Sequence, residues 1–314
     1  MRSLVAALAA LLPFGVAAQD LTLAGGHIQG NDPEGDGAAW WTGYTHDLPG
    51  PLFAGVGYLN EGHLPGHHRD GTAAFIGLRN DIPWHGLVFA LAAGPYRYFD
   101  TRKAQDPEGF RDAHGWGALY SASASWTPKG SRWFYEVRLA RVEADHHPDT
   151  SLLLVGVGAK LDQDSTFGRA DPPRAKGGRD ELVGYLGATI VNDFESPHSF
   201  SNSVEYRHAF TPAVRASLAW INEGDARLIR RNGVALQGWL EPTFNNGQFS
   251  MGLGFGPYIS VDDYHPGRHS IGLLSWTLSH RLTRSWNARF TWHRSVSDDD
   301  RDSDIILLGV GYQF

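Results

Sequence analysis

Alternation of apolar with small or polar residues, at a period of two, runs along almost the whole sequence of 314 residues. It is cleanest at the end of the chain, where one face carries Ile306, Leu308, Val310, Tyr312 and Phe314. A period of two places successive side chains on opposite faces of a β-strand and does not fit a helix. The sequence therefore predicts an all-β fold whose strands each have an apolar and a polar face.

The composition narrows the class of protein that such strands can build. The chain has 38 glycines, 12% aromatic and 19% charged residues, no cysteine and a net charge of -7. These values exclude a disordered chain, a disulfide framework and a zinc–thiolate site. The acidic balance also lacks the basic stripe typical of nucleic-acid-binding proteins. We therefore expect no nucleic-acid partner and no bound cofactor.

The first 18 residues have the features of a secretory signal peptide. A basic start at Met1-Arg2 precedes an apolar run over residues 4–16, and small residues at 16–18 form a cleavage site before Gln19. No later stretch reaches the roughly 18 consecutive apolar residues that a membrane-spanning helix needs. We therefore expect an exported mature chain of 296 residues, in which any membrane crossing is made by strands.

The mature chain contains an internal duplication. Asn60-Glu61-Gly62 recurs as Asn222-Glu223-Gly224, and Gly94-Pro95-Tyr96 recurs as Gly256-Pro257-Tyr258, both at an offset of 162 residues. Later matched pairs lie closer, and the offset falls to 153 residues at the glycines near the end of each half. An ordered series of pairs with a slowly shrinking offset indicates a duplicated unit that has lost loop residues.

Each half reads as eight strands joined by connections of alternating length. The predicted strands cover residues 21–29, 38–46, 52–60, 72–79, 87–100, 116–126, 133–143 and 151–161 in the first half. In the second half they cover residues 181–192, 200–210, 214–222, 234–244, 249–262, 271–282, 286–295 and 304–314. Short turns fall at one end of the predicted strands and longer polar loops at the other. In outer-membrane barrels the short turns are periplasmic and the longer loops are extracellular.

With these features the chain resembles the Gram-negative outer-membrane β-barrel proteins. The resemblance rests on the leader, the amphipathic strands and the last strand, which ends in Phe314. It implies a location in the cell outer membrane, in contact with outer-membrane lipid and lipopolysaccharide. It also implies insertion by the outer-membrane assembly machinery, which would read the last strand.

The number of barrels follows less directly from the sequence. Sixteen strands over 296 residues suit one 16-stranded barrel or two tandem 8-stranded barrels equally well. The polar segment 162–180, predicted as a periplasmic link, favours two closed units, whereas the single terminal Phe314 favours one sheet that inserts as a unit. We expect the repeats 19–161 and 181–314 to form one antiparallel transmembrane barrel of about 16 strands, with two tandem barrels as the alternative.

The barrel count decides the predicted function. Sixteen strands leave an aqueous lumen, whereas eight leave an interior filled by side chains. The predicted inner faces carry Glu136, Arg138, Glu205, Arg207 and Arg289. The sequence therefore predicts a channel or export conduit for hydrophilic molecules, in which these charges set the selectivity.

The repeated Asn-Glu-Gly motif would lie at the mouth of this channel. We interpret it as a turn that ends a strand, in which asparagine caps backbone groups and glycine supplies a positive φ. The alternative is that Glu61 and Glu223 contact a sugar or a cation.

Histidines suggest a metal site as a weaker hypothesis. His63, His67 and His68 lie in one predicted outer loop beside acidic residues, as a zinc or copper site would need. They match no defined ligand spacing, and the second repeat has no histidine at any of these positions. We therefore interpret them as surface residues.

Residues 293–295, His-Arg-Ser, suggest an enzyme as a second alternative. They are similar to the His-x-Ser of the outer-membrane lipid A deacylases, in which the imidazole activates the hydroxyl. With an acid from residues 298–300 they would form a lipid A-modifying acyl hydrolase. In that family the pair faces lipid, whereas the alternation here turns His293 and Ser295 inward. We therefore favour a protein that is not an enzyme, with this hydrolase and a non-enzymatic surface-binding barrel as alternatives.

Overall fold

The computed structural model describes residues 19–31, 34–82, 85–103, 109–145, 148–161, 178–244, 247–297 and 300–314. The predicted leader, 1–18, and most of the predicted link lie outside these residues. The first half forms β1 (Gln19–Asn31), β2 (Glu34–Asp47), β3 (Leu52–Leu64), β4 (His67–Ile82), β5 (Leu87–Lys103), β6 (Phe110–Trp126), β7 (Trp133–Ala144) and β8 (Thr150–Leu161). The second forms β9 (Asp180–Val191), β10 (His198–Ala209), β11 (Val214–Asn222), β12 (Arg231–Leu240), β13 (Thr243–Phe244), β14 (Phe249–Asp262), β15 (Arg268–Arg281), β16 (Trp286–Val296) and β17 (Ser303–Gln313). In the part of the chain that is described, no helix has the length and apolar character needed to cross a membrane.

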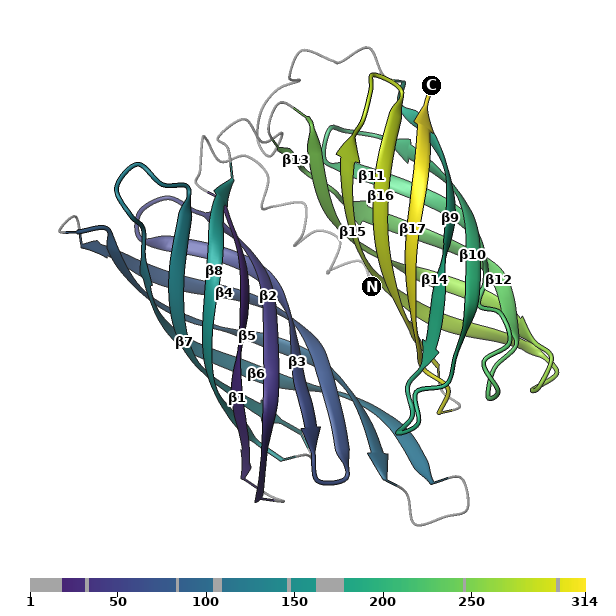
Figure 1. The fold of residues 1–314 in the computed structure, drawn as a ribbon, viewed down its shortest axis with the longest axis horizontal. Helices are drawn as coiled ribbons and strands as arrows, with labels where there is room; N and C mark the ends of the chain where they lie inside the picture. The colour runs from purple at the N-terminus through teal and green to yellow at the C-terminus, as the bar shows by residue number, and fades with distance from the viewer. Residues whose placement is uncertain are drawn as a thin grey trace. The chain divides into compact units, whose positions relative to one another are not determined.

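The first eight strands close into a ring that we call barrel 1 (Figure 1). Each strand pairs antiparallel with the next, and β1 pairs with β8 to complete the ring. In this closing pair Gln19 lies opposite Leu161, and Gly30 lies opposite Thr150. Because every strand has two partners, the sheet of barrel 1 has no open edge.

The remaining strands form a second ring, barrel 2 (Figure 1). Strand β9 pairs with β17 and β12 pairs with β14, so that eight strands complete the ring. The two-residue strand β13 pairs with the start of β14.

Two closed rings correct the expectation of a single 16-stranded barrel. The chain divides into two compact units between residues 163 and 164, within the segment predicted as the link. The physical reason is the strand pairing, since β1 is already paired with β8 and β9 with β17, which leaves no free edge for a common sheet. The all-β class, the antiparallel order and the 8+8 duplication are confirmed.

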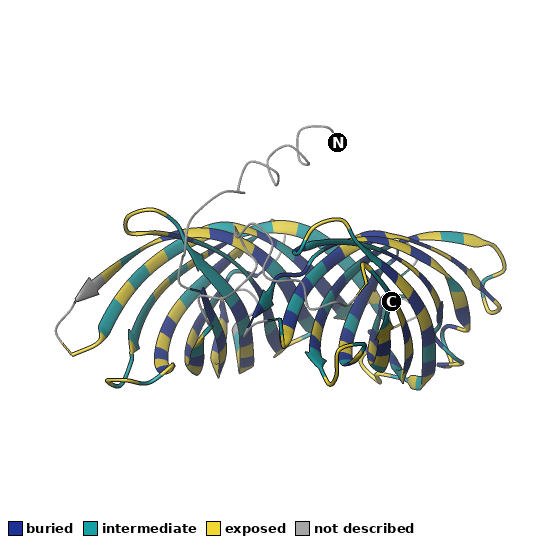
Figure 2. Cartoon of the chain, turned by 90° about the horizontal axis from the view of Figure 1, so that it is seen from above, coloured by how far each residue is buried: buried dark blue, intermediate teal, exposed yellow. Residues whose placement is uncertain are grey.

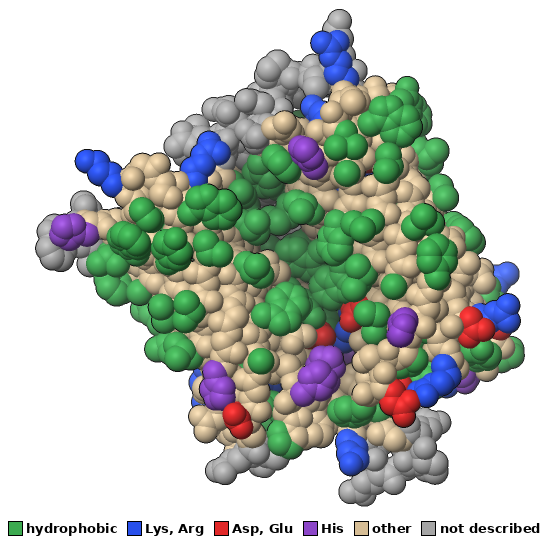
Figure 3. All heavy atoms as spheres, in the orientation of Figure 1, with side chains coloured by type: hydrophobic (Ala, Val, Ile, Leu, Met, Phe, Trp, Pro, Cys, Tyr) green, Lys and Arg blue, Asp and Glu red, His purple; other side chains and the backbone are tan. Residues whose placement is uncertain are grey.

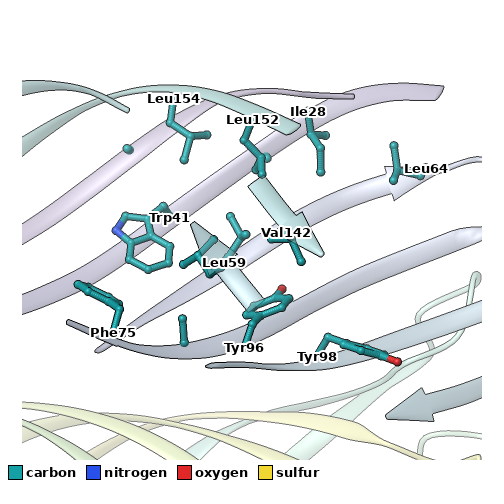
Figure 4. Packing of buried hydrophobic residues seen from close by; sticks show 14 of the residues in the cluster. Ile28, Trp41, Leu59, Leu64, Phe75, Tyr96, Tyr98, Val142, Leu152 and Leu154 are labelled. Atoms are coloured by element: carbon teal, nitrogen blue, oxygen red, sulfur yellow. The ribbon is translucent and has the colours of Figure 1, made fainter. Parts of the chain in front are cut away.

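Burial alternates along the strands of both barrels, as the striped ribbon in Figure 2 shows. Inside barrel 1 the alternation buries an apolar core that includes Trp41, Leu59 and Phe75 (Figure 4). Gly57 makes room for this core, because a Cβ atom there would come within 2.1 Å of the indole ring of Trp41. All three side chains are buried and therefore point into the barrel.

The two ends of each barrel differ. We call the end at turns 48–51 and 127–132 of barrel 1, and at turns 210–213 and 282–285 of barrel 2, the short-turn end, and the opposite end the loop end. All sixteen predicted strands are present, but several extend further at the loop end. The predicted outer loop 61–71 is largely strand, closed by a turn at Pro65 and Gly66.

Candidate functional site

The first copy of the Asn-Glu-Gly motif places a fully buried glutamate inside barrel 1. Glu61 accepts hydrogen bonds from Arg69 at 2.8 Å from Nε and 2.6 Å from Nη2. The hydroxyls of Tyr96 and Thr150 also donate to this carboxylate. Arg69 donates further, from Nη1 to the carbonyl of Pro148 at 2.8 Å. We call the four side chains of Glu61, Arg69, Tyr96 and Thr150 the clamp of barrel 1.

The same arrangement recurs in barrel 2. Arg231 donates to Glu223 at 3.0 Å from Nε and 2.9 Å from Nη2. The Ser303 hydroxyl donates to the same carboxylate, and Tyr258 is buried beside it in the place of the first clamp's tyrosine. Nη1 of Arg231 again donates to a backbone carbonyl, that of Arg301, at 3.1 Å. Glu223, Arg231, Tyr258 and Ser303 form the clamp of barrel 2.

Each clamp crosses its barrel near the loop end. Arg69 on β4 contacts Thr150 on β8 at 3.2 Å, although these strands lie four positions apart in a ring of eight. Arg231 on β12 contacts Ser303 on β17 at 3.0 Å across the same span. Side chains from opposite walls therefore meet in the middle of both barrels.

Sequence reasoning singled out the glutamate of each clamp and matched Tyr96 with Tyr258, but it did not connect the glutamate with the tyrosine, and it missed the arginine and the hydroxyl partner. The signal was present, because the 162-residue offset of the motif also relates Arg69 to Arg231. Thr150 and Ser303 are related by the later offset of 153 residues. A search for residues that can form hydrogen bonds and that recur at the offsets of the duplication would therefore have included all the residues of both clamps.

The residues that flank each glutamate form the predicted asparagine cap and positive-φ glycine. The motif follows the end of β11 in barrel 2, as predicted, but in barrel 1 it does not end the strand, because β3 continues through it to Leu64. Asn60 Oδ1 accepts a hydrogen bond from the backbone N–H of Gly62 at 2.9 Å, and Asn222 accepts one from Gly224 at the same distance. The φ angles of the two glycines are 68° and 75°, in the region that other residues rarely adopt. The strand register shifts at this point in barrel 1, and the glutamate of the motif faces the interior.

Between the clamp and the short-turn end, aromatic side chains fill barrel 1. The ring centroids of Trp41 and Phe75 lie 5.9 Å apart, and those of Phe53 and Phe75 lie 6.3 Å apart. The predicted inner charges of this half pair with each other, since Arg138 Nε lies 2.9 Å from Glu136. The guanidinium of Arg138 also lies over the Trp41 ring, at 5.0 Å from its centroid.

The corresponding region of barrel 2 holds a network of ion pairs. Arg207 donates to Glu205 at 2.9 Å and 3.0 Å, and to Glu241 at 2.5 Å. Arg289 donates to Glu241 at 3.0 Å and to Glu181 at 3.1 Å. All five side chains are buried. The predicted inner charges therefore face inward, but they pair within two separate barrels and do not line one shared lumen.

Beyond its clamp, barrel 1 carries a cluster of titratable residues at the loop end. His67 Nδ1 lies 2.8 Å from Asp100 Oδ2, and Arg102 Nε lies 3.3 Å from the same oxygen. His63 and His68 stack on each other, with ring centroids 4.1 Å apart. Among the residues that the structure describes, no three metal-ligating side chains converge. We call these five residues the loop-end cluster.

The loop end of barrel 2 is built differently. Ile229 occupies the position that corresponds to His67 of barrel 1, and it is buried with Val191 and Ala226. Nearby, Arg227 donates to Glu195 at 2.6 Å, and this hydrogen bond raises the pKa of Arg227.

Large apolar side chains cover the outer faces of both barrels. The exposed fractions reach 63% at Leu91 of barrel 1 and 69% at Phe255 of barrel 2. Figure 3 shows hydrophobic side chains spread over the visible outer surface, with charged and histidine side chains gathered toward its ends. A continuous apolar surface of this kind is rare on soluble proteins and is typical of barrels whose outer face contacts lipid. The chain forms two antiparallel eight-stranded β-barrels in tandem, each with an apolar outer face.

Comparisons of the tandem barrel with known proteins found similar solved structures only. No family model and no curated protein matches the chain. Neisserial surface protein A is 10% identical with a TM-score of 0.36, and the match covers 47% of this chain and 98% of that one. The N-terminal barrel domain of Pseudomonas aeruginosa OprF is 14% identical, with a TM-score of 0.31 and coverage of 44% and 100%. The Ralstonia pickettii toluene transporter TbuX is 9% identical, with a TM-score of 0.24 and coverage of 94% and 89%.

The tandem barrel holds the predicted hydrolase pair inside barrel 2. His293 and Ser295 are both buried, and His293 Nδ1 lies 2.6 Å from Ser275 Oγ. Ser295 Oγ lies 2.8 Å from Ser303 Oγ and 3.2 Å from Arg231 Nη2, so that it supports the clamp. The deacylase-like mechanism requires both side chains on the outer, lipid-facing side of the barrel, and neither His293 nor Ser295 lies there. The acid expected from residues 298–300 lies partly outside the described residues.

Proposed function

We propose that the protein resides in the outer membrane, has no open pore and acts by binding a polar partner at the loop end of barrel 1. The observation that carries this proposal is the filled interior of both barrels. It favours the non-enzymatic surface-binding barrel over the channel or conduit that the sequence predicted.

An eight-stranded ring has an interior just wide enough for side chains to fill. Each clamp spans its barrel near the loop end, through the 3.2 Å contact of Arg69 with Thr150 and the 3.0 Å contact of Arg231 with Ser303. Below the clamps, the aromatic cluster of barrel 1 and the ion-pair network of barrel 2 are buried. A hydrated solute would have to displace several of these side chains to pass.

The binding role rests on the length of three strands of barrel 1. Strands β4, β5 and β6 contain 16, 17 and 17 residues, whereas about 9–11 residues cross a bilayer as a tilted strand. Their counterparts in barrel 2, β12, β14 and β15, contain 10, 14 and 14. At the loop end, β4 and β5 run past their counterparts by residues 67–68 and 101–103, which include His67, His68 and Arg102 of the loop-end cluster.

The proposed partner is lipopolysaccharide, which would contact the loop end if that end faces the cell surface. His67 and Arg102 are partly exposed and offer N–H donors for sugar hydroxyls and phosphate groups, while buried Asp100 holds both side chains in place. Insertion by the outer-membrane assembly machinery belongs to the same proposal. It is supported by the outward, exposed Tyr312 and Phe314 at the end of the last strand.

Planar-bilayer recordings on the refolded full-length protein test the absence of a pore. We expect no stable conductance steps over a range of voltages and salt concentrations, with a general porin as the positive control. Large, stable steps from the wild-type protein would overturn the proposal and restore the channel.

Binding to lipopolysaccharide vesicles, compared with phospholipid vesicles, tests the recognition site. The variant His67→Ile copies the residue of barrel 2, and we expect it to weaken binding roughly fivefold, the equivalent of about 1 kcal/mol for one lost hydrogen bond. The matched control is His208→Gln, which changes a histidine paired with Asp180 at the short-turn end. Equal binding by the wild type and both variants would contradict a site at the loop end.

A further inference from the structure

A polar cavity lies at the short-turn end of barrel 2, far from the loop end. Its lining runs from exposed Gln248 to buried Glu241 and Arg289, and it includes Arg215 and Arg281. These two arginines stand on β11 and β15, each at the strand end that faces the short turns.

The arginines around this cavity outnumber the carboxylates that could neutralise them. The four arginines are Arg207, Arg215, Arg281 and Arg289. They meet three carboxylates, those of Glu181, Glu205 and Glu241, and each of the three acids is already in an ion pair. Arg207 and Arg289 each bridge two of the acids. Among the residues that the structure describes, Arg215 reaches only Glu241, through Nε at 3.4 Å.

Arg281 is the cation left without a counter-ion. Within the described part of the chain it forms no ion pair, and its charge is repelled by that of Arg215. The Nε atoms of Arg215 and Arg289 donate no hydrogen bond to any described residue. A partly buried guanidinium without a partner is costly, so this cavity favours an added negative charge.

In the described residues of barrel 1, no such surplus is present at the equivalent place. The positions that correspond to Arg215 and Glu241 hold Phe53 and Arg79. Arg79 is neutralised there by Asp20 at 3.1 Å and by Asp47 at 2.8 Å. The unmatched positive charge is therefore a property of barrel 2 alone and not a consequence of the duplicated fold.

We propose that the cavity at the short-turn end of barrel 2 is a binding site for a phosphate-class oxyanion, held between the guanidinium groups of Arg215 and Arg281. Two guanidinium groups offer the paired N–H donors that match the oxygens of a phosphate. The same chemistry is presented by inorganic phosphate and by the phosphate of a phospholipid head group.

Calorimetric titration of the full-length protein with inorganic phosphate, in a maltoside detergent without phosphate groups, tests the site. We expect saturable binding to the wild type and a loss of about tenfold or more in affinity for Arg281→Gln. Lys129→Gln, at an exposed turn of barrel 1, is the matched control for general charge effects and should bind as the wild type does.

Urea unfolding with and without phosphate gives a second readout that does not depend on heat of binding. Phosphate should raise the unfolding midpoint of the wild type and leave that of Arg281→Gln unchanged, because a ligand stabilises only the state that binds it. Without phosphate, Arg281→Gln should be at least as stable as the wild type, since Arg281 has no ion pair to lose.

A comparison of detergent with phospholipid vesicles distinguishes a phospholipid head group from free phosphate as the bound anion. If phosphate binds in maltoside but not in phosphatidylglycerol vesicles, a lipid head group occupies the site, and binding in both indicates the free anion. No phosphate binding by the wild type, or equal binding and equal stabilisation in Arg281→Gln, would overturn the proposal. Neither result depends on the loop end of barrel 1.

Discussion

Replacing Arg69 with methionine tests whether the clamp is a buried ion pair on which barrel 1 depends. The substitution keeps a long apolar side chain but removes the two hydrogen bonds to Glu61, the one to the carbonyl of Pro148 and the one to the hydroxyl of Thr150. Glu61 is fully buried, so its carboxylate would be left with only the hydroxyls of Tyr96 and Thr150. Removing one partner of a buried pair typically costs about 3–5 kcal/mol, and we expect a loss of this size.

The assay is equilibrium urea unfolding of the full chain in lipid vesicles, followed by tryptophan fluorescence. The double variant Glu61→Gln, Arg69→Met removes the orphaned charge and should recover part of the loss. The equivalent Arg231→Met should destabilise barrel 2 by a similar amount, because Glu223 is buried in the same way.

The result that refutes this reasoning is specific. A loss below about 1 kcal/mol in Arg69→Met is the behaviour of an exposed surface pair and would mean that water reaches the clamp. A double variant as unstable as the single one would show that the charge of Glu61 is not the cause of the loss.

Three further substitutions test the interior, the turn and the lipid-facing surface by the same unfolding assay. Trp41→Ala should cost about 3–5 kcal/mol, since it empties the centre of the aromatic cluster of barrel 1; a loss below about 1 kcal/mol would show a loosely packed interior. Gly62→Ala should destabilise far more than Gly130→Ala, because both positions have a positive φ but only at Gly62 would the new Cβ lie 2.1 Å from the carbonyl oxygen of Ala38. Leu139→Arg should cost about 2–4 kcal/mol in a bilayer, since a charge would face lipid; an unchanged free energy would place this face in water.

The sequence predicted the strands and their faces because both depend on local properties. Alternation at a period of two identified all sixteen main strands, and the inward orientation of His293 and Ser295 is confirmed by their burial. The predicted strand ends were less accurate at the loop end, where β3 and β4 continue through residues with polar side chains. The polar side chains of residues 61–71 suggested a loop. They are equally compatible with strands that extend beyond the apolar outer surface of the barrel.

The candidate sites were predictable in part. The duplication located Glu61 and Glu223, yet their partners lie up to 89 residues away along the chain and meet only when the ring closes. The loop-end cluster likewise joins β4 to β5, so that the pairing of His67 with Asp100 follows from strand register and not from sequence spacing. The surplus charge at Arg281 appears only once each carboxylate has been assigned to its arginine.

The sequence by itself determined the strand content, the two faces of each strand and the duplication, since side-chain period and repeated residues are written along the chain. Only the tertiary structure decided that the strands close as two rings of eight. Strand pairing is made by backbone hydrogen bonds, which any residue except proline can form, so that the pattern of side chains specifies which face is buried but not which strand is the neighbour. The pairing of β1 with β8 and of β9 with β17 settles that choice, and with it whether the interior holds water or side chains.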